Sequence, residues 1–195
     1  MITQRNQINS SDDELIGAIS GGDRHAMKLL YERHSVRVFR FAKRFAPDDI
    51  VTEDLVHDVF LDVWRQAGAF KGHSQVGTWL LAITRNKAFA IARRQPLDLL
   101  DDDVCEAIED GADNPETAMA KRRTSSLLFR CLANLSPRHR EIIDLVYYHE
   151  KSIDEVAQIV GVPHSTVKTR MFYARHHLAK VLSEAHLDKD DLLAA

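Results

Sequence analysis

Hydroxyl, aromatic and cationic side chains recur near the C-terminus at the spacing of an α-helix. From residue 156 to residue 183 the chain has no acidic residue, although its formal net charge is −3. At about 100° per residue, an apolar stripe falls on one side of this helix and short polar groups flanked by cations fall on the other. Such a face suits the base edges of duplex DNA, where an Arg or Lys aimed at guanine contributes roughly 1–3 kcal/mol of discrimination. The candidate residues are Ser165, Thr166, Lys168, Thr169, Arg170, Phe172 and Arg175.

The elements that would position this face have the pattern of a helix–turn–helix. Ser152-x-x-Glu155 is a capping box and predicts the start of a helix, as Ser11-x-x-Glu14 does near the N-terminus. A Gly-Val-Pro turn at 161–163 ends that helix, and a second helix is predicted from about His164 to Leu182. Two further helices are expected upstream, one of them after the Ser-Pro pair at 136–137. The second helix of such a motif enters the major groove of DNA.

Opposite charges are also segregated in the N-terminal half. A helix is predicted over Thr52–Gln66, with Asp54, Asp58 and Asp62 recurring every four residues along one flank. Like charges at this spacing cost roughly 0.2–0.5 kcal/mol per pair, which favours a basic protein partner over a merely solvated face. Residues 63–97 then carry six Lys or Arg and no carboxylate. Because this stretch joins a small-residue loop to a helix with aromatic, amide and cationic side chains, it suits unstacked bases of single-stranded DNA.

Composition predicts an all-α fold in two small domains. Helix-forming residues dominate, and Gly and Pro number only 8 and 5. Residues 96–117 carry nine acids without a Lys or Arg, which predicts a flexible acidic linker between helical modules at 12–95 and 118–183. No apolar run approaches the roughly 18 residues of a membrane span. The two cysteines lack metal-site spacing, and no nucleophile–base pair is evident. We therefore expect a cytoplasmic protein that is not an enzyme and has no metal and no cofactor.

Four motifs, in this order, resemble a bacterial extracytoplasmic-function (ECF, group IV) RNA polymerase sigma factor of the sigma-70 family. They are "EDLVHDVFLDVW", "FKGHSQVGTWLLAITRNKAFAIARR", "LSPRHREIIDL" and "SIDEVAQIVGVPHSTVKTRMFYARHHL". The resemblance implies sigma region 2 at 12–95 and sigma region 4 at 118–183. It implies an alternative sigma factor that binds core RNA polymerase at the β′ clamp helices and β flap, melts the −10 element and recognises the −35 element. A cognate anti-sigma factor is also implied.

The resemblance assigns residues to three surfaces. The core polymerase-binding residues, expected to be exposed, are Asp54, Asp58, Leu61 and Asp62. The −10 residues are Phe70, Lys71, Gly72, His73, Ser74, Trp79, Arg85, Asn86, Lys87, Arg93 and Arg94. Among these the cations of the helix would hold phosphates, whereas Trp79 has a competing interpretation as a core residue that holds the loop to the helix. The −35 residues are those of the C-terminal face above, where Arg170 and Arg175 hold phosphates or brace the fold.

Other functions stay open at this point. A stand-alone helix–turn–helix regulator would have no use for the acidic helix or the melting loop. A sigma-like module that sequesters an anti-sigma factor would be expected to lose its basic DNA faces. The acidic linker suggests a further hypothesis, self-inhibition against the chain's own basic faces.

Overall fold

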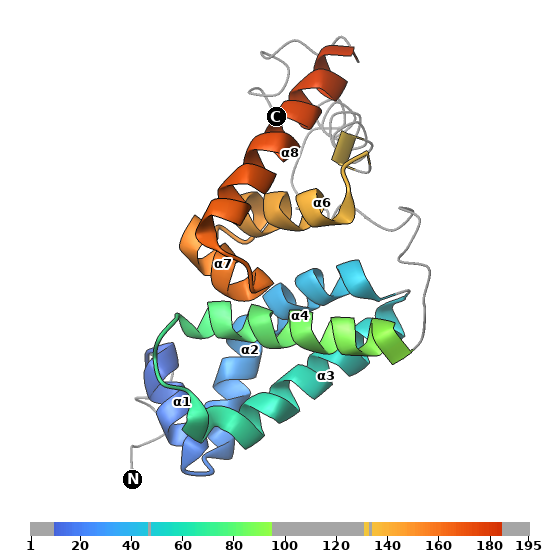
Figure 1. Cartoon of the computed structure of the whole chain (residues 1–195). Coiled ribbons are helices and arrows are strands. Elements are labelled where there is room, and N and C mark those ends of the chain that lie inside the picture. Colours follow the sequence, from blue (N-terminus) through green and yellow to red (C-terminus); the bar gives the residue numbers. More distant parts are fainter. Residues whose placement is uncertain (1–9, 47, 95–130, 133, 185–195) are drawn as a thin grey trace, which may run out of the picture. The chain divides into compact units, whose positions relative to one another are not determined.

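The computed structural model describes residues 10–46, 48–94, 131–132 and 134–184. These residues form helices and helical turns with no strand among them, so the all-α prediction is confirmed. The chain divides into two compact units (Figure 1). The acidic linker predicted at 96–117 and most of the helix predicted before Cys131 lie outside the described residues. Within the described ranges, no helix combines the length and apolarity that a membrane span requires.

The first unit packs its helices around one apolar core. It contains α1 (Asp12–Ser20), α2 (Arg24–Ala42), α3 (Asp49–Gln66) and α4 (Val76–Arg94), with short 3₁₀ turns η2 (Lys43–Phe45) and η3 (Ala67–Ala69). α2 packs against α1, α3 and α4. The buried side chains recur at helical spacing on each element, as Leu15, Leu30, Val38, Val59 and Leu80 illustrate. Burial of these stripes fixes the rotation of every helix and hence the faces that remain exposed.

Local capping determines where these helices begin. The predicted capping box opens α1, since Ser11 N–H donates to Glu14 Oε2 at 2.8 Å and Glu14 N–H donates to Ser11 Oγ at 3.3 Å. α3 begins at Asp49, three residues before the predicted start at Thr52. The cause is the N-cap Asp48, whose carboxylate accepts the Val51 N–H at 2.8 Å.

The second unit contains most of the helix–turn–helix. Its elements are α6 (Pro137–Ile143), a π-helical turn η4 (Asp144–Tyr148), α7 (Ile153–Val160) as far as Ala157, and α8 (His164–Glu184). α6 packs against α8. The connection between η4 and α7 includes Glu150, a non-glycine residue with a positive φ of 55°.

The second predicted capping box is also confirmed, because Ser152 N–H donates to Glu155 Oε2 and Glu155 N–H donates to Ser152 Oγ. The neighbouring Lys151 is buried, and its Nζ lies 2.8 Å from Glu155 Oε1. The turn after α7 uses Gly161 at φ 69°, a left-handed conformation that favours glycine. These contacts fix the entry of α7 and its exit toward α8.

Candidate polymerase and nucleic-acid interfaces

One flank of α3 presents the acidic residues predicted to contact the polymerase. Asp54 and Asp58 are exposed, and Leu61 is an exposed apolar residue at 50% of its full accessibility. The expectation of exposure is wrong for Asp62, which is only partly exposed because the side chain of Lys87 lies against it. The opposite side of α3 supplies Val59 and other buried residues to the core, so the flank is fixed in orientation.

Lys87 brings two predicted surfaces together. Its Nζ lies 2.9 Å from Asp62 Oδ2 and 3.9 Å from Asp58 Oδ2. Lys87 belongs to α4 and was predicted to hold DNA phosphates, whereas both carboxylates belong to α3 and were predicted to contact the polymerase. The structure thus joins the two groups of residues by an ion pair at the α3–α4 boundary.

The predicted base-capturing loop follows η3 and leads into α4. Lys71, Gly72 and His73 are exposed, and Ser74 is partly exposed. Gly72 has φ 68°, so a residue with a Cβ would strain the loop at this point. The loop thus presents exposed polar side chains on a backbone that favours glycine.

Two aromatic rings anchor this loop. The ring centroids of Phe70 and Trp79 lie 4.8 Å apart, and both side chains pack partly against the apolar core. This contact agrees with the interpretation of Trp79 as the residue that holds the loop to the helix.

Farther along α4 the predicted −10 residues differ in their surroundings. Asn86 is exposed, while the Arg85 guanidinium lies over the Phe89 ring, 4.5 Å from its centroid. Arg93 and Arg94 form the last turn of α4, but their side chains lie outside the described part of the chain.

α8 presents the predicted DNA-reading face as the helical period indicated. The apolar stripe is confirmed, since Val167, Met171 and Ala174 are buried. On the predicted DNA-reading face and its flanks, Ser165, Lys168, Thr169, Phe172 and Arg175 are exposed, and Thr166 and Arg170 are partly exposed. A buried stripe and an exposed polar, cationic face on one helix are the arrangement that a recognition helix requires.

Aromatic stacking organises the exposed side of α8 in a way that the sequence did not indicate. Phe172, at 65% of its full accessibility, stacks on His176 with ring centroids 6.4 Å apart and planes 7° apart. The Arg175 guanidinium lies 5.6 Å from the centroid of the Tyr147 ring, which comes from η4. An open groove of about 530 Å³ runs along this side; its lining residues are Ile153, Lys168, Met171, Phe172, Arg175 and His176.

Comparison with known proteins identifies the family. The model of sigma-70 region 2 matches residues 30–96, and that of sigma-70 region 4 matches residues 131–180. The ECF RNA polymerase sigma-E factor of Escherichia coli K12 is 31% identical over 174 residues, covering 85% of this chain and 91% of that protein. The chain belongs to the ECF sigma factors. The RNA polymerase sigma-H factor of Pseudomonas aeruginosa is 27% identical over 196 residues, covering 93% of this sigma factor and 96% of that one.

Solved structures share the fold of this sigma factor. CnrH, solved in complex with the cytosolic domain of CnrY, has a TM-score of 0.63 at 23% identity and covers 90% of this chain and 99% of its own. The sigma factor RpoE from Bartonella quintana, solved with the anti-sigma factor NepR, has a TM-score of 0.61 at 23% identity and covers 80% of this chain and 96% of its own. At this identity the likeness concerns the fold.

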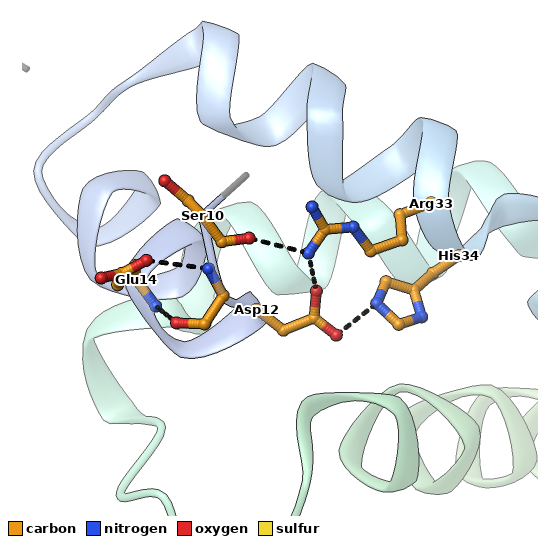
Figure 2. A network of polar contacts seen from close by, with 6 residues as sticks. Ser10, Asp12, Glu14, Arg33 and His34 are labelled. Atoms are coloured by element: carbon orange, nitrogen blue, oxygen red, sulfur yellow. Dashed lines mark hydrogen bonds and ion pairs between the residues drawn. The ribbon is translucent and has the colours of Figure 1, made fainter. Parts of the chain in front are cut away.

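A polar network of the sigma factor outside the predicted surfaces joins α1 to α2 (Figure 2). Arg33 donates through Nη1 to Asp12 Oδ1 and, at 3.0 Å, to the Ser10 carbonyl. His34 Nε2 lies 2.7 Å from Asp12 Oδ2, and burial lowers the pKa of His34 against the opposing influence of the Asp12 carboxylate. The matched range of region 2 starts at residue 30, within α2. The network therefore attaches α1, which precedes that range, to α2.

Proposed function

We propose that this sigma factor directs transcription initiation through three separate surfaces. Sigma region 2 is assigned to 12–95, an acidic linker to 96–117 and sigma region 4 to 118–183, which the matched ranges 30–96 and 131–180 support. The observation that carries the proposal is α8, where the buried stripe leaves one polar and cationic side available to the major groove. A helix–turn–helix positions such a side in the groove.

The acidic flank of α3 is proposed to bind the polymerase at its β′ clamp helices. Asp54 and Asp58 offer exposed carboxylates to basic side chains, and Leu61 offers an exposed apolar contact beside them. A mixed surface of this kind gives electrostatic orientation from the charges and affinity from the apolar centre. Asp62 contributes at the edge of the flank, where it also contacts Lys87. The β flap is the proposed polymerase partner of region 4.

The loop after η3 is proposed to capture an unstacked base of the −10 element. Phe70 and Trp79 hold the loop on α4 by their ring contact. Lys71 and His73 are exposed on the loop, and Asn86 is exposed on the following helix. An amide and polar loop groups read a base on its hydrogen-bonding edge, while nearby cations hold the backbone. Arg85 is one of these cations. Its guanidinium lies over the ring of Phe89, which belongs to the same helix, α4.

On α8, Ser165, Thr166, Lys168 and Thr169 are proposed to contact base edges of the −35 element. Arg170 and Arg175 are proposed to hold phosphates or brace the fold. Their exposure supports this assignment. Phe172 is proposed to contact a thymine methyl, because an exposed aromatic side chain gains free energy only when a partner covers it.

Two further parts of the proposal concern how the protein is regulated and where it acts. A cognate anti-sigma factor is the proposed regulator, supported by the similarity in fold to the sigma factor RpoE, which was solved with the anti-sigma factor NepR. The protein is proposed to act in the cytoplasm and without catalytic chemistry of its own.

Separate variants test the assignments of α3 and α8 in the full-length chain. Asp54→Asn combined with Asp58→Asn is expected to lower the affinity for core polymerase about tenfold, measured with labelled core enzyme. Lys168→Ala is expected to leave that affinity unchanged and to lower promoter binding by the holoenzyme, through the loss of a base contact worth roughly 1–3 kcal/mol. Equal affinity for core polymerase in the Asp54/Asp58 variant and the wild type would reject the assignment of α3.

A further inference from the structure

The position of Lys87 suggests how binding to the polymerase and binding to DNA are connected. The Lys87 ammonium lies 2.9 Å from the Asp62 carboxylate and 3.9 Å from that of Asp58. The side chains of Lys87 and Asp62 are 24% and 22% exposed, whereas that of Asp58 is 59% exposed. The closer pair is thus partly shielded from water, and a pair in that position keeps more of its attraction than a fully solvated one.

One ammonium group does not bind two carboxylates and a phosphate with full strength at the same time. A basic side chain that approaches Asp58 and Asp62 from solvent competes with Lys87 for the same oxygen atoms. The more exposed Asp58 is accessible first, and Asp62 keeps a second cation nearby, because Arg65 Nη1 lies 3.9 Å from its Oδ1. Binding of a basic partner therefore weakens the attachment of Lys87 to α3.

We propose that Lys87 is exchanged between the two surfaces: in the free sigma factor it neutralises Asp58 and Asp62, and when the polymerase binds these carboxylates it is released to hold a DNA phosphate. The inference rests on the polymerase and −10 surfaces proposed above. Because coupling between two binding events is reciprocal, DNA bound at Lys87 also strengthens binding of the polymerase. The charge of Lys87 thus connects the polymerase surface on α3 to the DNA surface on α4.

The first test measures the affinity of the full-length Lys87→Gln variant for core polymerase. Removal of the competing cation is expected to raise this affinity about threefold or more, a modest factor because the pair is partly solvated. The matched control is Lys28→Gln, which loses the same charge from an exposed pair with Glu32 on α2. If Lys87 only braced α3, its removal would lower the affinity, so an unchanged or lower affinity for the polymerase overturns the exchange.

The second test measures binding of the sigma factor alone to a fluorescent, mixed-sequence single-stranded DNA 20-mer. Asp62→Asn is expected to raise this affinity about threefold relative to the Glu32→Gln control, and Asp58→Asn is expected to act in the same direction by a smaller factor. The Asp62→Asn, Lys87→Gln double variant should bind the DNA no more tightly than the Lys87→Gln single variant. An increase of equal size in the double variant overturns the exchange, since it would not depend on Lys87.

The two proposals fail in different ways. A wild-type chain that does not associate with core polymerase rejects the proposed function itself. A wild-type chain that associates, together with a Lys87→Gln variant of unchanged affinity, rejects the exchange alone. Thermal unfolding of each variant establishes that it is folded, and the Asp58→Asn variant provides the same comparison if Asp62→Asn is unstable.

Discussion

Replacement of Asp12 by Asn removes the charge that ties α1 to α2 while it keeps the shape of the side chain. Asp12 receives a hydrogen bond from Arg33 and lies 2.7 Å from the ring of His34 (Figure 2). The His34 side chain is 9% exposed and that of Asp12 is 27% exposed. We predict that Asp12→Asn loosens α1 and lowers the free energy of unfolding of the first unit.

The size of the effect follows from the exposure of each contact. The pair with Arg33 is partly exposed and contributes about 0.2–1 kcal/mol. The hydrogen bond with His34 is better shielded and charge-assisted, so its loss costs about 1–2 kcal/mol. Because the Asn amide oxygen still accepts one of these bonds, the expected net loss is about 1–2 kcal/mol. In a unit of this size, each kcal/mol corresponds to a decrease in Tm of roughly 4–8 °C.

Tryptophan fluorescence isolates the unit that is perturbed. The chain has two tryptophans, Trp64 and Trp79, and both pack partly against the core of the first unit. Urea unfolding at pH 8 followed by their emission therefore reports that unit alone. The control is Asp13→Asn, an exposed carboxylate in the same turn with the same relation to the helix dipole. Equal urea midpoints for the Asp12 and Asp13 variants would show that the contacts of Asp12 with Arg33 and His34 do not stabilise the first unit.

Three further predictions concern pH, the α8 face and a backbone turn. Because burial lowers the pKa of His34 below 6.5, the unfolded chain binds the proton first; the urea midpoint of the first unit should fall as pH decreases below 6.5, and His34→Gln should reduce this slope. Phe172→Ala should weaken promoter binding by the holoenzyme about tenfold, a loss of about 1.4 kcal/mol, with little change in Tm because the ring is exposed; retained binding would contradict its role. Glu150→Gly should stabilise the second unit by about 0.5–1 kcal/mol in calorimetry, since the positive φ strains Glu; a lower transition temperature would contradict this.

Local rules predicted the parts of this fold that depend on neighbouring residues. The capping boxes at Ser11 and Ser152 follow from side-chain and backbone groups three residues apart, and both form. The buried stripe of α8, which includes Val167 and Met171, follows from the helical period alone. The same period placed Phe172 on the exposed side, where the structure has it.

Contacts between distant residues could not be predicted in this way. The Asp12–His34 pair joins residues 22 positions apart, and no local pattern distinguishes His34 from the other histidines. Likewise, Lys87 is one of several cations on α4, and only the packing of α4 on α3 places its ammonium near Asp62. The start of α3, by contrast, has a local signal in the capping residue Asp48, so it could be predicted from the sequence.

Start-site mapping with the full-length chain would show directly whether the protein directs initiation at specific promoters. Core RNA polymerase would transcribe sheared genomic DNA of the source bacterium with and without the sigma factor, and the 5′ ends of the transcripts would be sequenced. The proposed function predicts new start sites that share −35 and −10 elements and that are lost with the Lys168→Ala, Phe172→Ala double variant. A protein that binds core polymerase yet yields no new start sites, or start sites without a shared upstream sequence, would contradict it.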